Sequence, residues 1–224
     1  LQFFFEFPNV LSGQLNYRNM KQRDSTPNDP SYIQQWCHYV MDSEFAWAHN
    51  KGGLTSNGDT IVVAVIDGGN QPHEDLDFYV NRHEIPNNGL DDDHNGFVDD
   101  VSGWNAYNNN GNIPSDYHGN HVAGIIGAIG NNEEGVTGVN WNVKILPVAG
   151  SSSSQSTVVK AYDYVYTLRD IYNRTNGDSG AFVVSTNSSF GINQANPNSF
   201  PIWCNFYDSL AKAGILSATA TANA

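Results

Sequence analysis

Four short runs of mainly apolar residues limit what this chain can fold into more than any other feature. The runs span residues 61–66, 143–148, 181–184 and 215–221. They do not alternate apolar with polar residues, as a strand with one solvated face would. Runs of this kind are typical of parallel strands that helices cover on both faces.

Segments with helical spacing lie between these runs. Residues 118–129 are rich in glycine and alanine, which suits a helix lying close against a sheet. Residues 158–172 place apolar side chains on one face, and residues 200–213 form a third helical segment that ends at Gly214. The alternation predicts an α/β fold in three layers, with an open, mostly parallel sheet and helices on both faces.

Composition excludes several classes of function. The chain carries 10 Lys and Arg against 23 Asp and Glu, which gives a net charge of −13. This charge argues against nucleic acid and anionic membranes as partners, and no apolar run approaches the length of a membrane span. The two cysteines, Cys37 and Cys204, leave a disulfide open without implying one.

Polar residues gather at the expected carboxyl ends of the strands. Asp67 follows the first run, and His118 opens the first helical segment. The segment 189–191 follows the third run, and Asn223 follows the fourth. Because open α/β sheets bind ligands beyond the carboxyl ends of their strands, we expect these groups to converge on one rim.

An aspartate in contact with a histidine forms two thirds of a Ser-His-Asp arrangement. In such a site His118 would act as general base, while Asp67 would hold the other ring nitrogen and stabilise the imidazolium. An aspartate at a strand end is by itself a common turn or cap residue. The prediction therefore depends on the pair and on its order in the chain.

Two segments resemble the subtilisin-like serine proteases, or subtilases. They are Val63-Ala64-Val65-Ile66-Asp67-Gly68-Gly69 and His118-Gly119-Asn120-His121-Val122-Ala123-Gly124, with Asp before His as in that family. The resemblance covers residues 28–223. It implies a subtilisin-like fold and a secreted serine endopeptidase, a hydrolase that cleaves polypeptide substrates with a Ser-His-Asp triad.

The resemblance also assigns roles to individual residues. It places Asp67 and His118 in the triad and implies that Asn223 donates its side-chain amide to the oxyanion. The substrate backbone would pair, as an added strand, with Ser189, Phe190 and Gly191.

Three positions depart from the residues that are usual in the family. Gly68 stands in place of serine or threonine, Asn120 in place of threonine, and Ala222 in place of glycine. Gly68 removes a hydroxyl that can hydrogen-bond the catalytic carboxylate, and Asn120 is bulkier than threonine but polar. The aspartate, the histidine and the oxyanion asparagine are all present, so activity is weakened in principle and not excluded.

The resemblance divides the chain into two parts. Asn28-Asp29-Pro30 resembles the start of a mature subtilase catalytic domain, so residues 1–27 would be a propeptide tail or N-terminal extension. No segment up to Ala224 resembles the family's Gly-Thr-Ser nucleophile motif. We therefore expect residues 28–224 to be a catalytic domain that is incomplete at its C-terminus and inactive alone. The expected partner is its own propeptide or a C-terminal fragment that carries the serine.

The acidic stretch from Gly89 to Asp100 has the features of a calcium-binding loop. Oxygen-bearing side chains occupy alternate positions, and a glycine stands at the expected sharp turn. An EF-hand would need a glutamate where Ser102 stands. We therefore predict a calcium loop whose ligand positions differ from those of an EF-hand, with a solvated acidic loop as the alternative. The predicted ligands are Asp91, Asp93, Asn95, Asp99 and the carbonyl of Phe97.

The resemblance implies a second calcium site. The stretch from Ile129 to Val136 resembles the family's calcium loop after the catalytic histidine. Its ligands would be Asn132 together with Asp75 and Asp29. An ion held by three distant segments would tie the N-terminal segment to the core.

Two other classes of function stay open. One is a subtilase-like binding module without catalysis, a pseudoprotease stabilised by calcium, which the residues at positions 68 and 120 favour. The other is a calcium-dependent adhesion domain, which only the acidic stretch supports. For location and source, we expect a secreted or extracellular-surface protein of bacterial origin.

Overall fold

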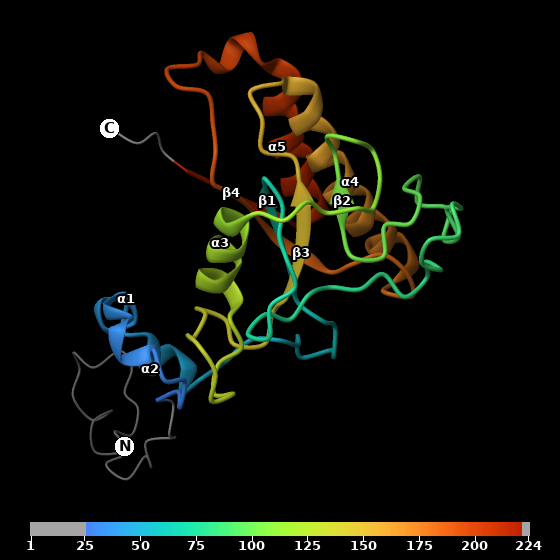
Figure 1. Cartoon of the computed structure of the whole chain (residues 1–224). Helices are drawn as coiled ribbons and strands as arrows, with labels where there is room; N and C mark the ends of the chain where they lie inside the picture. The colour runs from blue at the N-terminus through green and yellow to red at the C-terminus, as the bar shows by residue number, and fades with distance from the viewer. Residues whose placement is uncertain (1–25, 221–224) are drawn as a thin grey trace, which may run out of the picture.

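Residues 26–220 are described by the computed structural model of the chain (Figure 1). The predictions for residues 1–25 and for Asn223 lie outside these residues. The predicted propeptide tail and the predicted oxyanion donor therefore stay predictions.

Within residues 26–220, five strands form one sheet in which every neighbouring pair is parallel. The strands are β1 (Val62–Asp67), β2 (Trp104–Asn105), β3 (Lys144–Ala149), β4 (Val183–Ser188) and β5 (Leu216–Thr219). Their order across the sheet is β2-β3-β1-β4-β5. The predicted parallel sheet is confirmed, and β1 lies at its centre.

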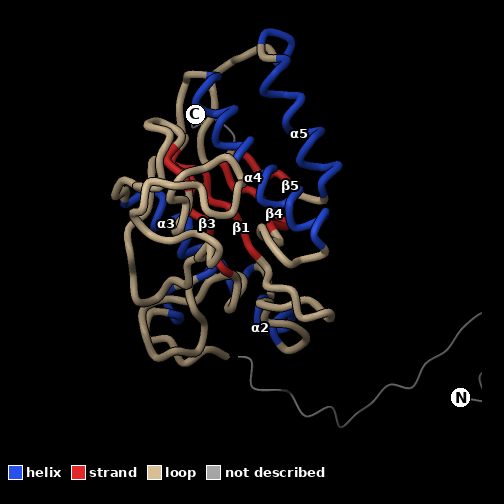
Figure 2. The backbone as a smooth tube through the Cα atoms, turned by 90° about the vertical axis from the view of Figure 1, so that its right-hand side faces the viewer, coloured by secondary structure: helices blue, strands red, loops and turns tan. Residues whose placement is uncertain are grey.

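Helices cover both faces of this sheet, which confirms the three layers (Figures 1 and 2). Helix α3 (Tyr117–Gly127) packs on one face, and α4 (Gln155–Thr175) and α5 (Pro201–Ala213) pack on the other. The N-terminal region adds two short helices, α1 (Trp36–Val40) and α2 (Ser43–Trp47). Single 3-10 turns, η2 (Tyr32–Gln34) and η3 (Pro197–Ser199), precede α1 and α5.

The central strand explains why its sequence does not alternate apolar with polar residues. Val62, Ala64 and Ile66 belong to the core cluster that α4 and α5 cover. Val65 belongs to a second cluster that includes Ala123 of α3. Because successive side chains of a strand point to opposite faces, a strand buried on both faces needs apolar residues throughout.

Strand β4 differs from its prediction in both length and character. The apolar run covers residues 181–184, but the strand spans Val183–Ser188 and ends in polar residues. It lies between β1 and β5, which satisfy its backbone hydrogen bonds. The buried Ser188 hydroxyl hydrogen-bonds the Tyr162 hydroxyl at 2.8 Å, so a polar side chain is tolerated inside the core. The segment 189–191 consequently starts directly at the carboxyl end of the strand.

The topology places a binding site at the end of β1. After β1 the chain forms β2 and β3 on one side of it and then β4 and β5 on the other. Such a switch point opens a crevice at the carboxyl ends of the strands. Asp67 is the last residue of β1 and therefore lies in that crevice.

Two further predictions from composition can be compared with the structure. Cys37 and Cys204 are both free thiols, so they do not form a disulfide with each other. Within residues 26–220, none of the helices has both the length and the apolar character that a bilayer crossing demands.

Candidate active site

Asp67 is held at the end of β1 with its carboxylate buried. The side chain is only 6% exposed, and the backbone N–H of Gly68 donates to Oδ1 at 2.7 Å. The Asp67 carbonyl accepts from the N–H groups of Gly150 and Ser151, which follow β3, at 2.8 and 3.0 Å. The residue is thus fixed by its own strand end and by the neighbouring one.

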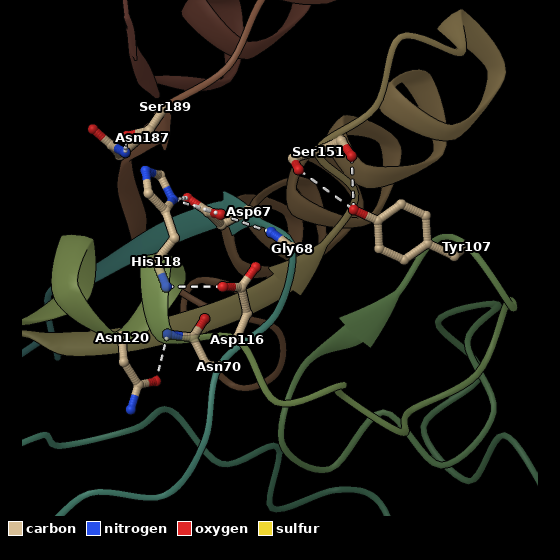
Figure 3. Close-up of polar contacts among 10 residues, drawn as sticks. All are labelled: Asp67, Gly68, Asn70, Tyr107, Asp116, His118, Asn120, Ser151, Asn187 and Ser189. Atoms are coloured by element: carbon tan, nitrogen blue, oxygen red, sulfur yellow. Dashed lines mark hydrogen bonds and ion pairs between the residues drawn. The ribbon is translucent and has the colours of Figure 1, made fainter.

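His118 lies in the first turn of α3 and points towards Asp67 (Figure 3). Its Nδ1 is 2.9 Å from each carboxylate oxygen of Asp67. Because an ionised carboxylate only accepts hydrogen bonds, Nδ1 carries the proton and Nε2 is the free acceptor of the neutral ring. The His118 side chain is 58% exposed, so a reacting group can reach Nε2 from outside.

The segments that carry these two residues interlock behind the pair. The N–H of Asn70 donates to the carbonyl of Pro114 at 3.0 Å. The Asn120 side chain accepts from the N–H of Gln71 at 2.8 Å and donates to its carbonyl at 3.1 Å. A Cβ at Gly119 would overlap the backbone carbonyl of residue 69, so the close approach requires glycine. Asn120 therefore ties the histidine helix to the loop after Asp67.

The predicted substrate segment lies on the same rim as the pair. Figure 3 shows Asn187 and Ser189 on the side of the imidazole that faces away from Asp67. The Asn187 side-chain amide donates to the Ser189 hydroxyl at 2.8 Å. Phe190 is half-buried against the core, whereas Gly191 is exposed and has no neighbouring atoms where a side chain would be. A cavity of about 180 Å³ opens beside this segment.

A cluster of three carboxylates lies beside the acidic loop. Oxygens of Glu84, Asp93 and Asp100 lie within 4.8 Å of one another, and Glu84 and Asp100 are buried. Burial raises the pKa of Asp100 to about 6; hydrogen bonds from Tyr164 and Asn81 oppose the rise, and Asp93 adds to it. Three hard oxygen donors in so small a space fit a divalent cation such as Ca²⁺.

Of the predicted loop ligands, one belongs to this cluster and another contacts it. Asp93 contributes one of the three carboxylates. The Asn95 side-chain amide donates to Asp93 and to Asp100, each at 3.2 Å. Phe97 places its ring edge-on against Tyr164, with 4.8 Å between the ring centroids, and anchors the loop to the core.

Asp91 and Asp99 hydrogen-bond the backbone of the loop, as Glu84 of the cluster also does. The Asp91 carboxylate accepts from the N–H groups of residues 95 and 96, at 3.0 and 2.9 Å. The Asp99 carboxylate accepts from those of residues 88 and 89, both at 3.1 Å. The structure therefore does not bring these two predicted ligands into the carboxylate cluster.

The second predicted site brings three distant segments together. Asp29 and Asp75 are both buried. Asp29 accepts from the Thr137 hydroxyl at 2.9 Å, and Asp75 accepts from the Asn132 side-chain amide at 2.9 Å. Two buried carboxylates beside an amide side chain supply oxygen donors of the kind that Ca²⁺ prefers. All three predicted residues of this site thus meet.

The comparison with protein families identifies the chain. A family model described as "Subtilase family" matches residues 58–224, which is well over half of the chain. The chain belongs to the subtilase family. Both segments that carry the Asp67–His118 pair lie inside the matched region. Serine protease activity is therefore supported at the level of the family.

Several proteases share sequence with this subtilase. It is 46% identical over 97 residues to Subtilisin-like protease 1 of Plasmodium berghei, covering 41% of this chain and 16% of that protein. It is 34% identical over 140 residues to an extracellular basic protease of Dichelobacter nodosus, covering 55% and 22%. It is 32% identical over 156 residues to an extracellular protease of Xanthomonas campestris, covering 63% and 25%. The matches thus span a quarter or less of these relatives.

Solved structures share the fold of this subtilase. A protease from Pseudoalteromonas arctica superposes with a TM-score of 0.56 at 22% identity, over 87% of this chain and 58% of that one. MycP1 without its N-terminal propeptide superposes with a TM-score of 0.51 at 15% identity, over 84% and 50%. The predicted subtilisin-like α/β fold is confirmed.

Three residues that the structure brings to these sites were not predicted from the sequence of this subtilase. Asp100 lies in the acidic stretch, and only its burial distinguishes it from its neighbours. Asp116 precedes His118 by two residues and caps α3, which is a recognisable helix-start pattern. Glu84 has no local signal, because only the fold brings it to the acidic loop.

Proposed function

We propose that this chain contributes the aspartate and the histidine of a Ser-His-Asp triad to a secreted serine endopeptidase. The observation that carries the proposal is the contact between Asp67 and His118. A buried carboxylate lies 2.9 Å from Nδ1 of an imidazole whose other nitrogen faces an open rim. This is the arrangement that general-base activation of a serine requires.

In this mechanism His118 moves one proton in two steps. Nε2 takes the proton of the serine hydroxyl as the serine oxygen attacks the peptide carbonyl carbon, and then gives it to the leaving amine. Asp67 holds the Nδ1–H, fixes the tautomer and stabilises the imidazolium that forms between the two steps. Asn223 donates an N–H to the tetrahedral oxyanion.

The substrate binds as an extended strand beside residues 189–191. This segment follows Ser188, the last residue of β4, and among the described residues no strand pairs with it, so its backbone groups are available to a substrate. Main-chain hydrogen bonds there hold any sequence in extended form, and the neighbouring cavity selects among side chains. The proposed substrate is therefore an extended polypeptide.

The proposed nucleophile is a serine beyond residue 224. Among residues 26–220, no serine hydroxyl hydrogen-bonds the His118 ring. The outer face of the histidine helix leaves Tyr117 82% and Ile125 53% exposed, beside a cavity of about 550 Å³. These apolar surfaces support packing of a further segment, which would carry the serine to Nε2.

Calcium is proposed to stabilise the fold at two places. Glu84, Asp93 and Asp100, with Asn95 beside them, would hold one ion and keep the acidic loop on the core. Asp29, Asp75 and Asn132 would hold another and tie the N-terminal segment to the loop after α3. In both places the ion would neutralise buried carboxylates and has no role in the proton transfers.

Secretion is supported by the two relatives named as extracellular proteases. A proposed partner is the chain's own propeptide, with residues 1–27 as its tail or as an N-terminal extension. A non-catalytic subtilase fold is the second candidate function, and it is favoured by Gly68 and Asn120, which stand where the family usually has hydroxyl-bearing residues.

Labelling with a fluorophosphonate probe tests the proposal on the full-length gene product. The probe should attach to a serine outside residues 1–224, and His118→Gln should abolish the labelling. His49→Gln is the control, because His49 is exposed and lies outside both the Asp67–His118 pair and the cavity beside α3, so it should not affect labelling. Labelling that survives His118→Gln, or the absence of any labelled serine, would refute the triad and favour the non-catalytic candidate.

A further inference from the structure

A second carboxylate lies close to the Asp67–His118 pair. Asp116 is the N-cap residue of α3, and its Oδ1 accepts from the backbone N–H of His118 at 2.8 Å. The cap stabilises the first helical turn, because that N–H has no partner within the helix. A carboxylate at this end also interacts favourably with the helix dipole. The backbone that carries His118 is thus held by Asp116.

The other oxygen of Asp116 occupies the space beside Gly68. A Cβ at position 68 would overlap Oδ2 of Asp116, and this carboxylate is its nearest neighbour. The backbone conformation of Gly68 is not left-handed, so the torsion angles there do not require glycine. The Asp116 carboxylate therefore occupies the place that a side chain at position 68 would take.

Gly68 is also the residue that holds Asp67. Its backbone N–H donates to Oδ1 of Asp67 at 2.7 Å, while the carboxylate of Asp116 lies beside its Cα. A side chain at position 68 would have to displace either Asp116 or the Gly68 backbone. Displacing the first would release the cap of the histidine helix, and displacing the second would move the hydrogen bond to Asp67. Figure 3 shows Asp116, Gly68 and Asp67 together on one side of His118.

We propose that Asp116 is a positioning residue of this site and that Gly68 is its steric partner. The Asp116 carboxylate sets the first turn of α3, from which His118 reaches Asp67, and it fills the place of a side chain at position 68. The two positions are coupled: a hydroxyl-bearing residue at 68 requires a smaller residue at 116. The catalytic consequence rests on the proposed function, but the geometry itself can be tested without turnover.

Histidine labelled with ¹⁵N in the 224-residue chain provides the readout. The ring ¹⁵N shifts of His118, assigned by their loss in His118→Gln, report whether Nδ1 carries the proton. Wild type should show the Nδ1–H form. Gly68→Ser should lose this preference and lower the melting temperature by about 4–8 °C, as expected for an overpacked site. Gly124→Ser is the matched control, because a side chain there meets no neighbouring atom.

The double variant Gly68→Ser/Asp116→Ala makes the proposal falsifiable. It should regain the Nδ1–H signal and melt above Gly68→Ser, whereas Asp116→Ala alone should lower the melting temperature by about 2–4 °C through loss of the cap. Asp116→Asn keeps a capping oxygen and should retain the signal. If Gly68→Ser does not fold, recovery of folding in the double variant carries the same support.

Three results would overturn the proposal. One is a Gly68→Ser protein with the wild-type ¹⁵N shifts and melting temperature. The second is a double variant no better than Gly68→Ser. The third is an Asp116→Ala protein that matches wild type in both readouts. Failure of the proposed protease function is a separate outcome, seen only in the fluorophosphonate labelling.

Discussion

The Asp100 carboxyl group should make the stability of the calcium-free protein depend on pH, and Asp100→Asn should remove that dependence. Asp100 is fully buried and faces Asp93, Glu84 and the hydroxyl of Tyr164. Burial, with the charge of Asp93, raises its pKa from 3.8 to about 6. The folded protein therefore binds this proton more tightly than the unfolded chain does.

The sign and size of the effect follow from proton linkage. The native state keeps the Asp100 proton to higher pH, so this group costs no stability below about pH 4 and destabilises progressively as the pH rises through 6. A difference of about two pKa units corresponds to about 3 kcal/mol of unfolding free energy lost by pH 7. A divalent ion bound to the ionised cluster would offset this loss.

Urea unfolding between pH 4 and 7.5 measures the effect directly. With chelator, wild type should lose stability as the pH rises, while Asp100→Asn should stay flat over the same window. With excess Ca²⁺, wild type should recover stability at pH 7, and the variant should recover less. Asp208→Asn, on the exposed side of α5, is the control and should behave as wild type.

Two results would refute this reasoning. If chelated wild type is as stable at pH 7 as at pH 4 and coincides with Asp100→Asn, the Asp100 carboxyl group is not raised in pKa. If calcium stabilises Asp100→Asn as much as wild type, the cluster at Glu84, Asp93 and Asp100 does not hold the stabilising ion.

Three further outcomes are expected. In the full-length protein, Asp67→Asn should lower turnover by about 10⁴-fold with little change in substrate binding, and unchanged turnover would contradict its role. Chelation should lower the melting temperature of the chain, and Asp75→Asn should make this decrease smaller by removing the second calcium site. Identical melting curves with and without chelator would exclude bound calcium. Leu210→Ala, which empties a fully buried position on α5, should cost about 2–5 kcal/mol in urea unfolding, whereas exposed Lys212→Ala should cost little.

The parallel sheet was predictable because a strand buried on both faces has an unbroken run of apolar residues in its sequence. The runs at 61–66 and 143–148 became β1 and β3 with a shift of one residue. Strand β2, with two residues, carries no pattern of its own and forms because it lies beside β3. Strand β4 extends into polar residues because its neighbours on both sides satisfy its backbone.

The candidate active site was predictable for a different reason. Asp67 and His118 lie at the ends of recognisable elements, and parallel strands bring such ends to one rim. The coupling of Asp116 with Gly68 was not predictable, because it depends on how two loops approach each other in space. From the sequence alone, Gly68 was notable only because it lacks the hydroxyl of the serine or threonine that is usual in the family.

The acidic stretch shows what a local pattern leaves open. Alternating acids favoured Asp91 and Asp99 as ligands, and both accept backbone hydrogen bonds from their own loop, outside the three-carboxylate cluster. Glu84 and Asp100 enter the carboxylate cluster because the folded loop buries them. A repeat in sequence cannot show which carboxylates the folded loop gathers into one cluster.

By itself, the amino-acid sequence determined which elements form and which side chains carry the chemistry, because both depend on local periodicity and on residue type. Only the tertiary structure decided the order of the strands, the contact of Asp67 with His118 and the membership of the carboxylate cluster. These depend on distances between groups 7 to 51 residues apart, set by packing that no local segment contains.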